Sequence, residues 1–296
     1  MAPGGDRFAF VPESTPYQVL LFDGDGAFEA TVGTRGDGPG EFQRIRIVRF
    51  DEHGRLWVVS RDGRRLDIFE SDLALASSES VREPIVHMGP VTGGMAAAVA
   101  TAEGGRIGLL SPSGEVGALW SGTSNAEMMP GGLTAFETDG RRRIFFAEAH
   151  TYRVWEVDLS GAVRALVDHA PDWFAARFRP EVAAQMGSSA GTINALDYDP
   201  ASDRLWMITG VPSEEITVDE INDYYQDPDL DPDALIAAMV DHVTEVFDAS
   251  DGRSLGVSRG DLTRSLTSAT PFRLAGPETV ELLELALEES GSAGGG

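Results

Sequence analysis

The stretch VLLFDGDGAFEATVG at Val19–Gly33 consists of a short apolar run, a Gly/Asp turn and a second run of strand-forming residues. The same plan recurs along the chain, at Leu66–Ser78, Ile107–Trp120, Val154–Val167 and Thr244–Val257. The central turn residues lie 46, 42, 47 and 91 positions apart; they are Gly26, Asp72, Gly114, Gly161 and Gly252. A period of about 42–47 residues with several short strands per unit is typical of a β-propeller and not of a helical solenoid.

Each unit predicts four strands, which we name a to d from the propeller axis outward. The second unit shows this order most clearly. Arg44–Phe50 alternates polar and apolar residues, and Leu56–Ser60 is a nearly continuous apolar run of the kind found in strands buried on both faces. Leu66–Phe69 and the weaker stretch Ala74–Ser78 complete the unit as strands c and d.

The first unit begins at strand b, because FAFVP, QVLLFDGDG and FEATVG match strands b, c and d. The C-terminal segment ATPFRLAGPETVELLELALEE must then supply what the ring lacks, so that no sheet edge stays open. We predict an all-β, six-bladed propeller, with five blades as the alternative. Residues 1–290 form its single domain, closed by N- and C-terminal strands, and residues 291–296 form a flexible tail.

Two irregular segments interrupt the repeat, residues 169–189 between units four and five and residues 212–243 inside unit five. Asp172 as an N-cap predicts a short helix in the first, and LIAAMVDHV at Leu235–Val243 predicts one in the second. The d–a and b–c connections of a propeller leave on the same face, so we expect both helical insertions on one face. Long connections of this kind are often functional; the alternative is that they only cover an edge of the fold.

The composition limits the class of partner. The chain has 48 acidic residues against 23 basic ones, all of them arginine, and a net charge of −25. Nucleic acid and anionic lipid are bound mainly by neutralising their charge, so we expect neither as a partner. Cysteine is absent, which removes disulfides, thiolate metal sites and thiol nucleophiles. We expect a monomer whose partner is a protein or a small-molecule ligand.

The sequence contains no apolar run long enough to predict a membrane span. Its first ten residues lack the basic and apolar regions of a secretory signal. The sequence as it stands therefore predicts a cytoplasmic protein. If its N-terminus is truncated, which would also explain the missing first strand, the expected location is the periplasm or the cell exterior.

The segment Gly33–Asp72 resembles the NHL-repeat pattern, in which a GPGEF-type loop leads to an apolar strand, an Asp-x-x-Gly turn, an LWV-type strand and an Arg-containing third strand. The matching residues are Gly38, Pro39, Gly40, Phe42, Asp51, Gly54, Arg65 and Phe69. More broadly, the chain resembles the bacterial six-bladed β-propeller proteins related to NHL repeats, many of which are exported. The resemblance implies the fold, whereas function carries over poorly, because propellers host binding scaffolds, lyases, lactonases and hydrolases alike.

The GPGEF loop itself has a structural and a functional interpretation. In the first, its glycines permit unusual backbone angles, Pro39 stiffens the turn and Phe42 fills the space between blades. In the second, the loop cradles a phosphate, although neither a helix N-terminus nor a lysine follows it. The residues favour the structural interpretation.

The second insertion is unusually acidic. Its ten acids, with no arginine among them, are Glu214, Glu215, Asp219, Glu220, Asp223, Asp227, Asp229, Asp231, Asp233 and Asp241. Clustered carboxylates are ligands that calcium prefers, but Pro232 and Ala238 stand where an EF-hand loop needs Gly and Glu. Helix capping and solvated acids are therefore the favoured interpretation. We expect no cofactor or resident metal, with calcium as the alternative.

A candidate ligand site lies on the expected loop face. Its residues are Arg61, Arg64, Glu148, His150, Tyr152, Asp172, Trp173 and Arg177. The arginine pair suits bidentate binding of a carboxylate or phosphate, and Trp173 suits stacking on a ring or cation. The alternative is structural: the arginines pair with the acidic insertions and Trp173 packs the lid.

These observations favour a non-catalytic propeller that recognises a partner or small ligand through its lidded top face. The alternative is a metal-assisted, lactonase-like hydrolase or lyase with its site at the mouth of the axial channel. That site would need acids or histidines converging from several blades, to which Asn194 and Asp197 could contribute. No motif links a Ser, a His and an acid, so the catalytic residues stay unknown and an enzyme is the less favoured interpretation. A third reading is a module of a longer exported protein.

Overall fold

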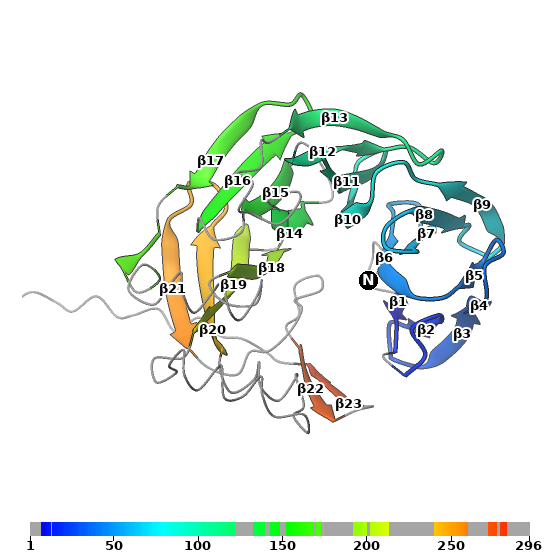
Figure 1. Cartoon of the computed structure of the whole chain (residues 1–296). Coiled ribbons are helices and arrows are strands. Elements are labelled where there is room, and N and C mark those ends of the chain that lie inside the picture. Colours follow the sequence, from blue (N-terminus) through cyan, green and yellow to red (C-terminus); the bar gives the residue numbers. More distant parts are fainter. Residues whose placement is uncertain are drawn as a thin grey trace, which may run out of the picture.

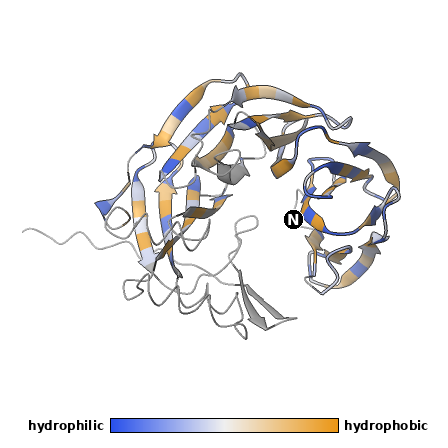
Figure 2. Ribbon diagram, in the orientation of Figure 1, coloured by the Kyte–Doolittle hydropathy of each residue, from blue (hydrophilic) through white to orange (hydrophobic). Residues whose placement is uncertain are grey.

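The computed structural model describes residues 7–12, 14–102, 104–121, 133–139, 143–148, 152–168, 170–172, 174, 192–199, 202–212, 240–259, 272–276 and 279–282. Their strands form antiparallel sheets that follow one another around a ring (Figure 1). Five of the sheets have three or four strands and are blades, so the predicted all-β propeller is confirmed. Hydrophobic and hydrophilic residues alternate along many of the strands, as expected for short strands packed between neighbouring blades (Figure 2).

In every blade the strands are paired in their order along the chain. Blade 1 consists of β1 (Arg7–Phe10), β2 (Val19–Asp23) and β3 (Phe28–Val32). Blade 2 consists of β6 (Ile45–Phe50), β7 (Leu56–Ser60), β8 (Arg65–Phe69) and β9 (Leu75–Ser80). Blade 3 consists of β10 (Ile85–Val91), β11 (Gly94–Thr101), β12 (Gly104–Leu110) and β13 (Val116–Ser121).

Blades 4 and 5 repeat the four-stranded order. Blade 4 consists of β14 (Leu133–Thr138), β15 (Arg143–Glu148), β16 (Arg153–Asp158) and β17 (Val163–Val167). Blade 5 consists of β18 (Thr192–Asp199), β19 (Arg204–Pro212), β20 (Val240–Asp248) and β21 (Ser254–Arg259). The inner strands of the four-stranded blades, β6, β10, β14 and β18, lie nearest the centre of the ring (Figure 1).

Two further strand pairs lie outside the blades. A short parallel pair, β4 (Thr34–Arg35) and β5 (Glu41–Phe42), holds the loop that connects blades 1 and 2. A hairpin of β22 (Phe272–Gly276) and β23 (Thr279–Leu282) lies between blade 5 and blade 1 in the view of Figure 1. Among the described strands, β1 pairs only with β2 and the hairpin strands pair only with each other. Closure of the ring by combined terminal strands therefore stays a prediction.

Aspartates at one end of the blades explain the repeated turn in the sequence. The Oδ1 atom of Asp51 accepts hydrogen bonds from the backbone N–H groups of His53 and Arg55, at 2.9 and 3.0 Å. Asp158 makes the same turn between β16 and β17 by accepting from the N–H of Ala162 at 3.0 Å. The strand ends that meet at a–b and c–d turns lie at this end of the described blades, which we call the bottom face. The opposite strand ends form the top face.

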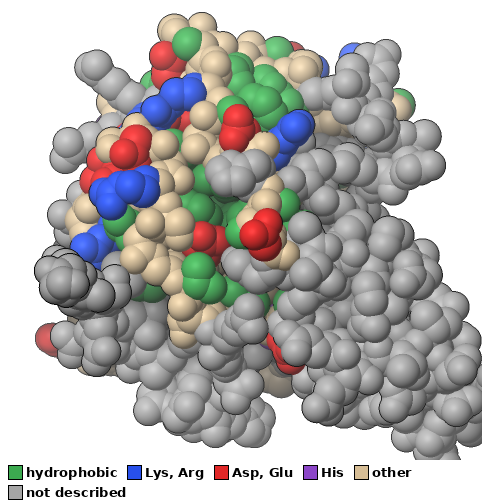
Figure 3. Space-filling model, turned by 90° about the vertical axis from the view of Figure 1, so that its left-hand side faces the viewer, with side chains coloured by type: hydrophobic (Ala, Val, Ile, Leu, Met, Phe, Trp, Pro, Cys, Tyr) green, Lys and Arg blue, Asp and Glu red, His purple; other side chains and the backbone are tan. Residues whose placement is uncertain are grey.

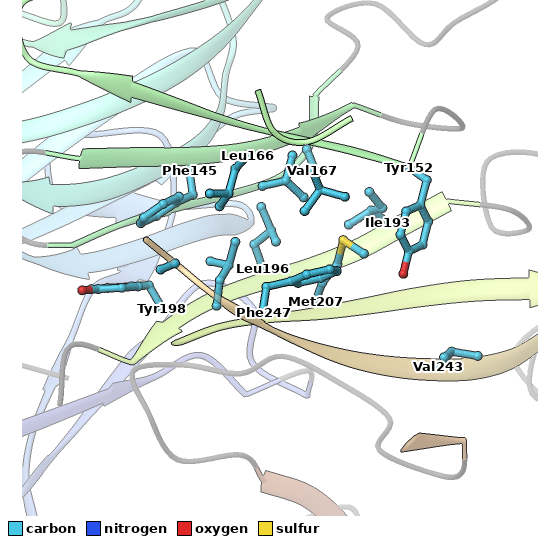
Figure 4. Close-up of a cluster of buried hydrophobic side chains, with 14 of the residues drawn as sticks. Phe145, Tyr152, Leu166, Val167, Ile193, Leu196, Tyr198, Met207, Val243 and Phe247 are labelled. Carbon is cyan, nitrogen blue, oxygen red and sulfur yellow. The ribbon is translucent and has the colours of Figure 1, made fainter. Parts of the chain in front are cut away.

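Among the described residues the core consists of four hydrophobic clusters, one at each interface between consecutive blades. Phe42 is only 1% exposed and lies in the cluster between blades 1 and 2, which confirms that it fills the space between blades. The largest cluster joins blades 4 and 5, where Phe145 packs against Tyr198 with ring centroids 5.2 Å apart (Figure 4). Blade packing, and not any single blade, therefore forms the hydrophobic core.

The described residues correct part of the predicted insertions. The helix predicted over Leu235–Val243 is wrong for its last four residues, because Val240–Val243 begin β20 and pair with Thr209–Pro212 of β19. This pairing gives hydrogen-bond partners to backbone N–H and C=O groups of β19 that would otherwise have none on that side. In the first insertion Asp172 and Phe174 have helical backbone, and residues 175–189 and 213–239 lie outside the described residues. Within the described ranges, no helix is long and apolar enough to cross a membrane.

Candidate functional site

The register of blade 2 brings together four arginines at its top end. Ile45 of β6 pairs with Ser60 of β7, which pairs with Arg65 of β8, which in turn pairs with Ser80 of β9. The residues just beyond this row include one arginine from each strand end. We call them the arginine edge; its members are Arg44, Arg61, Arg64 and Arg82, and all four are exposed.

Few carboxylates balance the arginine edge. Arg61 Nη2 donates to the carbonyl oxygen and to Oδ1 of Asp37, both at 2.8 Å. Arg64 Nη1 donates to the carbonyl oxygen of Arg82 at 2.8 Å. Among the residues that the structure describes, Arg44, Arg64 and Arg82 form no ion pair. Of the four guanidinium groups of the edge, only that of Arg61 is paired with a carboxylate among the described residues.

Several arginines elsewhere among the described residues are paired with acids. On the outer side of the ring near β17 and β21, acidic and arginine side chains lie next to one another (Figure 3). Arg164 pairs there with Glu156 across β16 and β17. At the bottom face Arg143 binds Asp203 at 2.7 Å and Asp139 at 3.2 Å. Compared with these sites, the arginine edge carries an excess of positive charge.

The ion pair between Arg65 and Asp67 of β8 is buried next to the arginine edge. Arg65 Nε lies 2.9 Å from Oδ2 of Asp67, and their side chains are 7% and 0% exposed. Arg65 also donates to the backbone carbonyls of Asp37 and Gly38 in the GPGEF loop. Asp67 Oδ1 accepts from the N–H of Gly40 at 3.1 Å. The loop that presents Asp37 to Arg61 is therefore held by the same two side chains, in agreement with its structural interpretation.

The turn that carries Arg61 has an unusual backbone. Arg61 and Asp62 have φ angles of 51° and 56°, a region that residues with a Cβ rarely adopt, and Gly63 follows with φ 86°. A Cβ on Gly63 would lie 2.4 Å from the carbonyl oxygen of Ile85, so the turn lies directly on the first residue of blade 3. Such backbone outliers tend to occur where the surrounding structure holds a functional side chain in place.

One predicted site residue, Tyr152, is buried at the interface of blades 4 and 5. Tyr152 is 1% exposed, and its ring packs against Phe174 with centroids 4.8 Å apart. Its hydroxyl donates to Oε2 of Glu245 on β20. Burial, together with this bond to a carboxylate, raises the pKa of Tyr152 well above its ordinary value. In Figure 4 Tyr152 and Tyr198 lie at opposite ends of the hydrophobic cluster.

The structure thus describes only part of the predicted site. It brings Arg61 and Arg64 together in one turn, and it buries Tyr152 as an inter-blade contact. Asp172 is exposed in the connection between blades 4 and 5. Blade 3 stands between the arginine pair and Tyr152. The side chain of Glu148, and the residues His150, Trp173 and Arg177, lie outside what the structure describes.

Two features of the edge were missed at the sequence level. Arg44 and Arg82 belong with Arg61 and Arg64, and an alignment of the predicted strand ends in unit two would have placed all four together. Arg61 pairs with Asp37 of the GPGEF loop, while residues 213–239 of the acidic insertion lie outside the described residues, so the structural alternative for the arginines stays a prediction.

Within the described ranges, no group of three or more His, Asp or Glu side chains is placed to hold a metal ion. The DPDLDPD run, where calcium was the alternative interpretation, lies outside the described residues.

Comparisons with known proteins agree with the fold. A family model described as a 6-bladed beta-propeller matches residues 5–71, which span blade 1 and β6–β8. The chain is thus a β-propeller protein and resembles six-bladed relatives, while the described residues form five blades and the β22–β23 hairpin. The relation to NHL repeats stays a prediction. No curated protein matches the chain by sequence.

Solved structures of similar fold come from several bacteria. A member of the DUF4221 family from Bacteroides vulgatus has a TM-score of 0.58 at 10% identity, over 86% of this chain and 78% of that one. A Bacteroides fragilis protein, provisionally described as an exported protein, has a TM-score of 0.50 at 10% identity. The likeness covers 84% of this chain and 67% of that one. Kuenenia stuttgartiensis hydrazine synthase has a TM-score of 0.52 at 11% identity, over 88% of this chain and 64% of that one. At these identities the likeness concerns the fold alone.

Proposed function

We propose that this protein is a non-catalytic binding protein that recognises an acidic segment of a partner protein through the arginine edge. A β-propeller is a general scaffold for interaction and binding. The observation that carries the finer proposal is the row of four exposed arginines in a chain whose net charge is −25. Guanidinium groups bind carboxylates in a bidentate manner, and such charge-assisted bonds are among the stronger polar contacts.

The spacing of the edge suits an extended peptide. Neighbouring strands lie about 4.8 Å apart, so the four strand ends of blade 2 span about 14 Å. A peptide that rises about 3.3 Å per residue crosses this span with four or five residues. A short acidic segment would therefore meet several arginines at once, whereas a long polyanion would also meet the acidic remainder of the surface.

The predicted locations are compatible with this role. The sequence as it stands predicts the cytoplasm, and a longer N-terminus would predict the periplasm or the cell exterior. In each of these locations the edge would meet other proteins. Because complementary charge mainly raises association rates, binding should weaken as salt is added.

The test uses a fluorescein-labelled octaglutamate peptide and fluorescence anisotropy at low and moderate salt. The variant R64Q/R82Q removes two charges from the edge. The matched control R204Q/R253Q removes two charges from the bottom end of blade 5. We expect the edge variant to bind about tenfold more weakly, as for the loss of one or two charged contacts, and the control to bind within about twofold of the unmodified protein. Equal weakening by both variants, or no peptide binding at all, would overturn the proposal.

A further inference from the structure

One carboxylate of the protein itself already lies on the arginine edge. Asp37, in the GPGEF loop, has a side chain that is 69% exposed, and its Oδ1 atom accepts a hydrogen bond from Arg61 Nη2 at 2.8 Å. The same nitrogen donates to the backbone carbonyl oxygen of Asp37, also at 2.8 Å. Asp37 therefore gives Arg61 the kind of partner that a carboxylate of an acidic peptide would give it.

Several contacts hold the backbone of Asp37 in this place. Arg65, which forms the buried pair with Asp67, donates from Nη1 to the carbonyl oxygen of Asp37 at 2.9 Å. The N–H of Asp37 donates to Oε2 of Glu41 at 3.1 Å, so the loop closes on one of its own side chains. The parallel pair of β4 and β5 closes the base of the loop. The position of Asp37 therefore follows from the fold of the loop and not from Arg61 alone.

The carboxylate of Asp37 can leave without releasing Arg61. The side chain of Arg61 is 45% exposed, so both members of the pair are within reach of a ligand. If the Asp37 side chain turns away, the bond from Arg61 to the carbonyl oxygen remains, because Arg65 holds that oxygen separately. An exposed ion pair contributes little to stability, so a ligand that binds neighbouring arginines at the same time can replace it.

We propose that Asp37 is an internal competitor of the acidic ligand: its carboxylate occupies Arg61 in the unbound protein and leaves when the ligand binds the arginine edge. This inference rests on the proposed function, because it concerns the same site. At Arg61 the ligand only exchanges one ion pair for another. Its net gain comes from Arg44, Arg64 and Arg82, which have no carboxylate partner among the described residues. Asp37 thus favours segments whose acidic residues reach several arginines at once.

The test repeats the anisotropy titration of labelled octaglutamate with two single variants. D37N removes the competing charge and keeps the carbonyl oxygen that holds Arg61. D62N is the matched control, because Asp62 follows Arg61 in the same turn and is exposed, but forms no ion pair among the described residues. Asparagine tolerates the φ angle of 56° at this position. We expect D37N to bind about threefold more tightly than the unmodified protein, and D62N to stay within about 1.5-fold of it.

A double-mutant cycle separates competition from a general effect of charge. Without the guanidinium of Arg61 there is nothing for Asp37 to occupy, so R61Q and R61Q/D37N should bind octaglutamate within about 1.5-fold of each other. No gain from D37N, an equal gain from D62N, or the same gain from D37N with and without Arg61 would overturn this inference and leave the proposed function standing. If neither the unmodified protein nor D37N binds octaglutamate, the proposed function fails, and this inference fails with it.

Discussion

The hydroxyl of Tyr152 in blade 4 donates a hydrogen bond to the carboxylate of Glu245 in blade 5, and both residues are buried at the interface of the two blades. Ser254 donates to the other oxygen of the same carboxylate. A residue chosen from the sequence as a ligand contact thus joins two blades. The buried acid depends on both donors, because a carboxylate inside a protein is stable only when its oxygens are hydrogen-bonded.

Replacing Tyr152 with Phe should therefore destabilise the protein. The variant leaves one oxygen of Glu245 without its donor, at a cost of about 1–3 kcal/mol in the free energy of unfolding. Tyr198→Phe is the matched control, since Asp203 keeps its bond from Arg143 and is 48% exposed. We expect the control to lose about 1 kcal/mol or less. Urea unfolding measures both; an equal loss in the two variants would contradict the inter-blade role of Tyr152.

Arg65→Met should cost more than the removal of any arginine from the edge. The change leaves the fully buried Asp67 without its cation, which costs about 3–5 kcal/mol. Arg61→Met breaks an exposed pair with Asp37 and should cost about 1 kcal/mol or less. The double variant R65M/D67L should recover much of the loss, because it removes the unpaired charge as well. Chemical denaturation of the three variants checks this order.

Gly63→Ala should be far more damaging than Gly93→Ala. Both glycines have positive φ angles, 86° and 90°, so each alanine carries a backbone penalty of about 1–2 kcal/mol. Only at Gly63 would the new Cβ also collide with backbone, 2.4 Å from the carbonyl oxygen of Ile85; at Gly93 nothing lies within 4 Å. Thermal unfolding should show a clearly lower Tm for G63A. Similar Tm values would mean that the turn can move away from blade 3.

Stability should fall as the pH is lowered from about 6.5 to about 4, in part through His87. The folded protein keeps this residue neutral down to about pH 4, whereas the unfolded chain takes up the proton near pH 6.5. The unfolded state therefore binds more protons in this window, so the free energy of unfolding falls as the pH is lowered, by at most on the order of 3 kcal/mol.

His87→Gln is the variant that isolates this contribution. Carboxylates also titrate near the lower end of the window, so the quantity to compare is the difference between the two proteins. The variant should lose less stability between pH 6.5 and pH 4.5 than the unmodified protein. Parallel curves of unfolding free energy against pH would show that His87 does not titrate there as expected.

Much of the fold followed from local patterns. The Asp-x-x-Gly turns at Asp51 and Asp158 hydrogen-bond within four residues, so the same turn can be recognised in every copy. Alternation along β6 and the apolar run of β7 likewise predict strands without reference to other blades. The helix expected over Leu235–Val243 failed at its end because pairing with β19, a partner distant in the sequence, outweighs local helix propensity.

The sequence by itself determined the repeat, the order of strands in each blade and the acidic charge of the whole molecule. Only the tertiary structure decided which charges meet. Arg44 and Arg82 join Arg61 and Arg64 because strand pairing aligns the ends of four strands. The pKa of His87 in blade 3 is lowered by burial and by the charges of Arg49 and Arg46 in blade 2. Turns and alternation are encoded over a few residues, whereas such charge clusters arise from pairing and packing between segments far apart in the chain.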